Sequence, residues 1–329
     1  MPTPVSVIIP VYNGSKTISE CIENLKKKNK NQKLEIIIIN DGSTDNTINI
    51  LDKINNIKVI SLKKNKGVGY ARQYGTKVAK FDTLCYLDSD VFVSKDSIKK
   101  LVKKLKSNKS IGSTGAIQKT VNLNKENWSS NFVCLKSCYG FDDVKKDVEF
   151  SVIHSEFCLI SRKYLNSIGG WKYFAGAGGE EFELGHRILA SEKKIILIKD
   201  ANYITYYPSL LSRFFEVIGR TEKYVALALK RKKFDTKGSF ATSGQAFSAL
   251  ITGFYALIIT ASFLLTVKIN TLLLPFFLIQ FLSEFSFLKY AFKIYGLKMF
   301  FYSLLAIQVI NFGIILGTIK FISKKILKY

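Results

Sequence analysis

The first third of the chain alternates between short apolar runs and segments whose apolar residues recur every three or four positions. The four runs are VSVIIPVY (5–12), EIIIIN (35–40), IKVISL (57–62) and TLCYLD (83–88). Runs of this length with turn residues beside them indicate strands buried on both faces. The segments between them have helical spacing, as in Ile18, Cys21, Ile22 and Leu25. This alternation predicts an α/β fold with a doubly wound, mainly parallel sheet.

From about Gly244 onward the chain becomes strongly hydrophobic. Three apolar runs cover residues 246–267, 269–288 and 299–319. The first is long enough to cross a bilayer, whereas polar residues in the second favour a buried or re-entrant position. We therefore expect residues 244–329 to form a membrane domain with two or three helices. Core helices of a soluble domain are the alternative.

The net charge of +24 has a membrane explanation as well as a nucleic-acid one. Five basic residues precede the first apolar run, where positive charge favours the cytoplasmic side and anionic lipids: Lys230, Arg231, Lys232, Lys233 and Lys237. No nucleic-acid recognition motif is present, so we expect no nucleic-acid partner. The N-terminus starts directly with a strand and no basic n-region, so we expect a multi-pass membrane protein whose N-terminal domain stays cytoplasmic.

The chain divides by composition into residues 1–211, 212–243 and 244–329. The middle segment mixes aromatic and aliphatic residues with basic ones, as in SRFFEVIGRTEKYVALALKRKKF (212–234). That mixture suits a helix lying in the membrane interface, and equally an amphipathic helix packed on a protein surface. The position of the C-terminal lysines stays open, because two spans would place them inside and three would place them outside.

Carboxylates follow two of the predicted strands. Asp41 follows the second strand, Asp88 ends the fourth and Asp90 follows it. The carboxyl ends of parallel strands meet at one edge of a sheet, so these side chains should converge. Two hard oxygen ligands suit Mg²⁺ or Mn²⁺, which shares its coordination shell with substrate phosphates. A solvated turn is the alternative explanation for the pair.

Five segments occur in a fixed order: SVIIPVYNG, IINDGSTDNT, NKGVGYAR, YLDSD and GGEEFELGHRI. Together they resemble the motifs of family 2 glycosyltransferases, which have the GT-A fold, over residues 5–190. The resemblance implies transfer of a sugar from a nucleotide-diphosphate sugar to an acceptor hydroxyl. It also implies inversion at the anomeric carbon and a divalent metal, Mg or Mn.

The resemblance assigns roles to the donor side of the site. Asp41 matches the aspartate that hydrogen-bonds the donor base, and Arg72 matches an arginine near the nucleotide. Gln73 departs from the Asn that often follows that arginine. Asp88 and Asp90 match the metal-binding motif, with Asp88 also on the donor side.

On the acceptor side, Glu181 matches the catalytic base, which is usually an aspartate. A glutamate within reach of the acceptor hydroxyl can take the same proton. The alternative is that this acidic cluster only favours a helix N-terminus. Glu180 is a further acceptor-side candidate, and pairing with Arg187 is its alternative role. Trp171 matches a position that packs near the acceptor in the family, although it could instead fill the core.

We therefore expect a membrane-bound, metal-dependent inverting glycosyltransferase of cell-envelope polysaccharide biosynthesis, acting on a lipid-linked or other glycan acceptor. The Gln-x-x-Arg-Trp motif of processive synthases is absent from the sequence, which favours few additions. A polyprenyl-phosphate glycosyltransferase is one alternative. A non-catalytic nucleotide-sugar-binding membrane protein is another. Homo-oligomers are compatible with all three.

Overall fold

The computed structural model describes residues 2–123, 127–142, 144–174, 178–231, 243–265 and 270–326. The chain forms two compact units, and each takes residues from two parts of the sequence. The α/β unit comprises Met1–Leu123 and Gly140–Tyr206, and the helical unit comprises Asn124–Tyr139 and Tyr207–Tyr329. The division by composition at residue 211 did not include residues 124–139 in the second unit.

The α/β unit begins with the predicted parallel strands. They are β1 (Val5–Val11), β2 (Leu34–Asn40), β3 (Lys58–Ser61) and β4 (Thr83–Leu87), in the order β3-β2-β1-β4. Each lies within one residue of its predicted bounds. All seven residues of β1 are buried, as expected for a strand covered on both faces.

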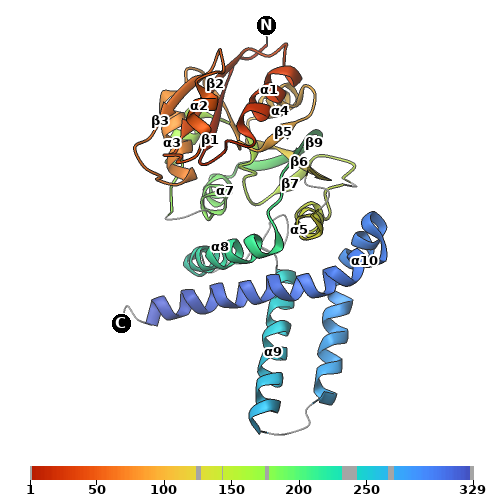
Figure 1. Cartoon of the computed structure of the whole chain (residues 1–329). Helices are drawn as coiled ribbons and strands as arrows, with labels where there is room; N and C mark the ends of the chain where they lie inside the picture. The colour runs from red at the N-terminus through yellow and green to blue at the C-terminus, as the bar shows by residue number, and fades with distance from the viewer. Residues whose placement is uncertain are drawn as a thin grey trace. The chain divides into compact units, whose positions relative to one another are not determined.

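Helices connect these strands (Figure 1). They are α1 (Ile18–Lys28), α2 (Thr47–Leu51), α3 (Val68–Val78) and, later in the chain, α4 (Ser97–Ser107). The buried residues of α1 are the four predicted from its spacing. Gly75 in α3 packs against Ile8 of β1, where a Cβ would lie 2.3 Å from Ile8 Cγ2.

The rest of the sheet is mixed rather than parallel. Its strands are β5 (Val91–Val93), β6 (Ile111–Asn122), β7 (Val148–Phe150), β8 (Phe157–Ser161) and β9 (Lys194–Thr205). β8 lies antiparallel between β4 and β6, while β9 runs parallel to β6 and antiparallel to β5 and β7. Only three residues separate β4 from β5, too few for the crossover that a parallel neighbour requires. The helices of this part are α6 (Arg162–Ser167) and α7 (Glu180–Ala190).

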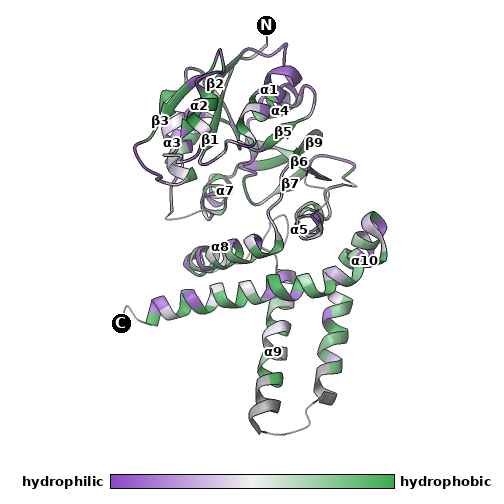
Figure 2. Ribbon diagram, in the orientation of Figure 1, coloured by the Kyte–Doolittle hydropathy of each residue, from purple (hydrophilic) through white to green (hydrophobic). Residues whose placement is uncertain are grey.

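The helical unit contains α5 (Trp128–Cys138), α8 (Leu210–Arg231), α9 (Ser243–Leu265) and α10 (Asn270–Ile326). Apolar residues dominate α9 and α10 (Figure 2). Within the described residues, one helix, Leu274–Ile326, is long and apolar enough to cross a membrane, and a shorter apolar helix covers Gly244–Ile259. α5 joins this unit through Phe132 and Leu135, which share a buried cluster with Phe287 and Met299.

Candidate active site

Two loops at the carboxyl ends of β1 and β2 are cross-linked by hydrogen bonds. The Asn13 side-chain oxygen accepts from the Thr44 backbone N–H at 2.8 Å, and Asn13 has the positive φ of 53° that asparagine tolerates. Gly14 N–H donates to Thr47 Oγ1 at 2.9 Å. These bonds fix the edge of the sheet on which the predicted site lies.

Asp41 connects the end of β2 to the start of α3. The residue is 3% exposed, and its carboxylate accepts hydrogen bonds from the backbone N–H groups of Lys66 and Gly67, both at 2.8 Å. The side chain thus fixes the loop that leads into α3. Its contact with a donor base stays a prediction.

Arg72 lies at the centre of the site. Its guanidinium is buried and donates to Asp88 Oδ1 at 2.8 Å. Another guanidinium nitrogen lies 3.5 Å from Glu180 Oε1, and the group stands over the Trp171 ring at 5.1 Å. One side chain of α3 therefore joins the end of β4 to the first residue of α7.

The surroundings of Asp88 and Asp90 disfavour the charged form of both carboxyl groups. Desolvation raises the pKa of Asp88, and Arg72 opposes that rise. Desolvation, and then the charge of Asp88, raises the pKa of Asp90 to about 7. A divalent cation would favour the charged form of both carboxyl groups, so the pair fits Mg²⁺ or Mn²⁺.

The rest of the cation's coordination shell would have to come from elsewhere. Among the described residues, no group of three or more His, Cys, Asp or Glu side chains could enclose a metal ion. Mg²⁺ is commonly bound by one or two carboxylates together with substrate phosphates. Asp88 keeps 28% of its side chain exposed while bonded to Arg72, which leaves it accessible to a ligand.

Glu156 is a carboxylate of this site that the sequence did not reveal. Its charge raises the pKa of both Asp88 and Asp90, and its backbone oxygen accepts from Asp88 N–H at 2.9 Å. It lies one residue before β8, which pairs antiparallel with β4. Knowledge of the antiparallel pairing of β8 with β4 would have identified Glu156. A prediction of a parallel sheet does not include this pairing.

Glu180 and Glu181 begin α7 after two glycines with positive φ. Gly178 and Gly179 have φ of 90° and 102°, a conformation that side chains with a Cβ rarely adopt. Both glutamates are buried, at 3% and 8% exposure. The charge of Glu181 acts on both Arg72 and Asp88. The structure thus brings the predicted metal pair and the predicted base into one electrostatic cluster.

Trp171 is buried beneath Arg72. It is 3% exposed, and its ring meets Tyr86 edge to face at 5.0 Å. Its backbone N–H donates to Gln73 Oε1 at 2.7 Å, which gives the departure at Gln73 a role in holding this loop. Trp171 supports the guanidinium from below, and its contact with an acceptor stays a prediction.

Comparisons with known proteins agree with this fold. The family model described as Glycosyl transferase family 2 matches residues 6–169. The glycosyltransferase GlyG of Streptococcus pneumoniae is 28% identical over 181 residues, 53% of each chain. A poly-β-1,6-N-acetyl-D-glucosamine synthase of Staphylococcus aureus is 34% identical over 111 residues, 33% of this chain and 27% of the synthase. The chain thus spans about half, or less, of these relatives.

Solved structures show the same fold at low identity. The mannosyltransferase PcManGT from Pyrobaculum calidifontis, in complex with GDP-Man and Mn²⁺, superposes with a TM-score of 0.59 at 17% identity, over 99% of this chain and 88% of that one. S. aureus TarS 1–349 in complex with UDP-GlcNAc superposes with a TM-score of 0.51 at 18% identity, over 97% and 92%. The chain therefore carries a family 2 glycosyltransferase domain with the GT-A fold.

Proposed function

We propose that this protein is a membrane-bound, metal-dependent, inverting glycosyltransferase. It moves a sugar from a nucleotide-diphosphate sugar to a hydroxyl of a lipid-linked glycan acceptor. The observation that carries the proposal is the bridge made by Arg72, which holds Asp88 at 2.8 Å and Glu180 at 3.5 Å. This bridge supports a single site that includes the predicted metal motif and the acidic start of α7.

Each carboxylate has a part in the proposed reaction. Asp88 and Asp90 would hold the divalent ion, which neutralises charge on the leaving diphosphate when it is bound. Glu181 accepts the proton of the acceptor hydroxyl as that oxygen attacks the anomeric carbon. Arg72 keeps Asp88 and Glu180 in place and adds positive charge beside the diphosphate. Asp41 orders the loop before α3 and faces the donor base.

The choice of donor and acceptor draws on the comparisons and on composition. The GDP-Man and UDP-GlcNAc complexes of GT-A structures support a nucleotide-sugar donor, and the Mn²⁺ in one supports a divalent metal. The polysaccharide synthase relative supports a glycan product. The apolar helices α9 and α10 support attachment to a membrane, where lipid-linked acceptors lie.

Product analysis tests this function. The full chain, purified in detergent, is supplied with Mn²⁺, a panel of UDP- and GDP-sugars and a bacterial lipid extract. The masses of the products are then measured by mass spectrometry. We expect a glycan lipid heavier by one or a few sugar residues. A sugar attached directly to a polyprenyl phosphate would favour that alternative instead. Donor binding with no product from any extract would favour the non-catalytic binder.

A further inference from the structure

α10 cannot be a single membrane span. It has 57 residues, about 85 Å at 1.5 Å per residue, against about 30 Å for the hydrocarbon core. Gly296, with φ 75° and ψ −168°, interrupts the helix and separates residues 270–295 from residues 297–326. Figure 1 shows the first part running antiparallel beside α9 and the second part turning sharply away. We call the first part with α9 the hairpin, and residues 297–326 the crossing segment.

The crossing segment has an exposed apolar stripe. Its exposed large residues include Leu297, Phe301, Leu305, Phe312, Ile319 and Ile326. At 100° per residue these six fall within about 80° of the helix circumference. Leu305 is 72% exposed and Ile326 67%. A stripe of this length favours contact with an apolar environment over contact with water.

The opposite face of the crossing segment packs closely on α8. Gly313 and Gly317 lie about 120° and about 160° around the helix from the middle of the stripe. A Cβ on Gly317 would lie 2.6 Å from the Ile218 backbone oxygen, and one on Gly313 would lie 3.2 Å from that of Phe214. Small residues four apart allow such close helix contact.

Charged groups lie along the α8 side of this packing. Glu222 of α8 pairs with Lys320 at 3.1 Å and also with Lys324. The two lysine side chains are 48% and 58% exposed. These ion pairs belong where water reaches, because charged groups in the hydrocarbon core are costly.

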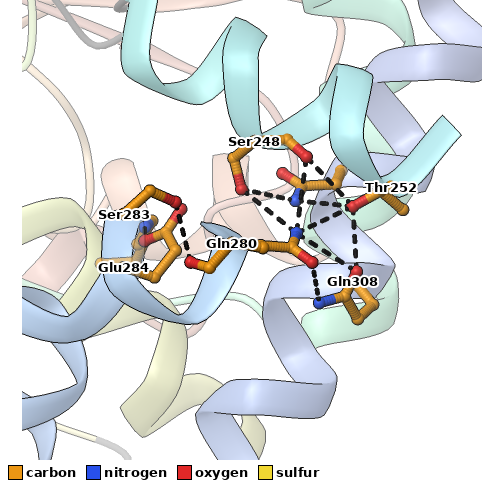
Figure 3. Close-up of polar contacts among 8 residues, drawn as sticks. Ser248, Thr252, Gln280, Ser283, Glu284 and Gln308 are labelled. Carbon is orange, nitrogen blue, oxygen red and sulfur yellow. Dashed lines mark hydrogen bonds and ion pairs between the residues drawn. The ribbon is translucent and has the colours of Figure 1, made fainter. Parts of the chain in front are cut away.

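A buried polar cluster fixes the direction of the stripe (Figure 3). Gln308 of the crossing segment accepts from Thr252 of α9 at 2.9 Å and donates to Gln280 of the hairpin at 3.1 Å. Asn311 donates to Ser248 of α9 at 2.9 Å. Gln308 lies within the arc of the stripe, about 20° from Leu297. The stripe therefore faces the hairpin side, and α8 covers the other side.

We propose that the crossing segment lies in the plane of the membrane interface, with its stripe on lipid and α8 above it on the aqueous side. The hairpin enters the same bilayer from beneath the stripe. Exposed lysines occur at both ends of the segment, at Lys298 and at Lys320, Lys324 and Lys325, where they meet anionic head groups. If the segment spanned the membrane, the lysines at one of its ends would lie on the opposite side. The third apolar run of the sequence is then an interfacial helix, and both its ends lie on one side.

Cysteine labelling in sealed vesicles tests the position of the two ends. The five native cysteines are buried, so the unmodified protein sets the background. Single variants Lys298→Cys and Ser323→Cys are exposed to a membrane-impermeant maleimide before and after detergent is added. We expect both to be labelled from the same side. Labelling from opposite sides would overturn the inference.

A depth measurement gives an independent answer. Nitroxides on Leu305→Cys and Ile319→Cys should report equal, shallow depths by power saturation with oxygen and a nickel chelate. A spanning helix would separate them by about 21 Å, since 14 residues rise 1.5 Å each. The inference rests on the membrane attachment in the proposed function, but neither readout requires turnover. If vesicle flotation shows that the protein does not bind membranes at all, the attachment fails while the transfer chemistry remains to be judged by its products.

Discussion

At the scale of single residues, Arg72 explains how separate motifs form one site. One carboxylate partner directly follows β4, the other begins α7, and the ring partner comes from the loop before α7. A lysine in its place would present one point charge and could not make the same forked contacts. Because Arg72 and Glu180 are both buried, loss of the guanidinium would remove the cation that lies 3.5 Å from a buried carboxylate.

We predict that Arg72→Met destabilises the domain by about 3–5 kcal/mol, as expected when one partner of a buried ion pair is removed. Urea unfolding followed by tryptophan fluorescence measures this, since Trp171 lies beneath the guanidinium. Adding Glu180→Gln to Arg72→Met should recover part of the loss, because it removes a buried negative charge that faces the guanidinium in the native protein. Strictly additive effects of the two substitutions would contradict the bridge.

At the scale of elements, close packing at two glycines joins α8 to α10. Gly317 has backbone of α8 within 2.6 Å of where its Cβ would be, whereas Gly219, inside α8, has nothing within 4 Å. Gly317 and Gly219 share the same helix-propensity penalty, so they form a matched pair. Any difference between their alanine variants reports the packing.

We predict that the two alanine variants change stability in opposite directions. Gly219→Ala should raise stability by about 0.5–1 kcal/mol through helix propensity. Gly317→Ala should lower it by about 1–3 kcal/mol, because α8 must move away from α10. Thermal unfolding of the detergent-solubilised protein compares them. Equal stabilisation by both would show that the close contact does not exist.

At the scale of the whole molecule, the helical unit draws on a segment from the middle of the sequence. α5 buries Phe132, Leu135 and Cys138 in the same cluster as Phe287 and Ile307 of α10. A chain cut at residue 211, the boundary that composition suggests, would lack the α10 residues of this cluster.

We predict that a 1–211 fragment aggregates because α5 is uncovered, as exposed apolar patches of this kind do. The same fragment with Phe132→Ser and Leu135→Ser should give a higher soluble, monomeric yield by size-exclusion chromatography. If the unmodified fragment is already monomeric and soluble, α5 does not depend on the helical unit.

The sequence predicted the parts of the fold that local patterns determine. The first four strands and the stripe of α1 were confirmed because burial on both faces and helical spacing leave a local signature. The antiparallel position of β8 beside β4 was not predictable, because pairing between strands far apart in the sequence leaves no local signature. Glu156 was missed for that reason, and Arg72 was assigned to the nucleotide without its second partner, Glu180.

The apolar runs of the C-terminal part were found, but their positions relative to lipid were not. Hydropathy over residues 299–319 is the same for a span and for a helix lying in the interface. Contacts such as those of Gly317 with α8 and of Gln308 with Thr252 separate the two faces of the crossing segment. These contacts join residues that lie 56 or more positions apart in the sequence.

The most direct test of the central claim compares donor binding and sugar transfer in Asp90→Asn and Glu181→Gln, with Glu149→Gln, at an exposed ion pair, as the control. Donor affinity is measured by calorimetry over a Mn²⁺ titration, and transfer by release of nucleoside diphosphate with acceptor present. The account predicts that Asp90→Asn loses the Mn²⁺-dependent gain in donor affinity. Glu181→Gln should keep that gain but transfer at least about 100-fold more slowly, as expected for loss of a general base. Unchanged transfer by Glu181→Gln, or Mn²⁺-dependent binding that survives in Asp90→Asn, would contradict it.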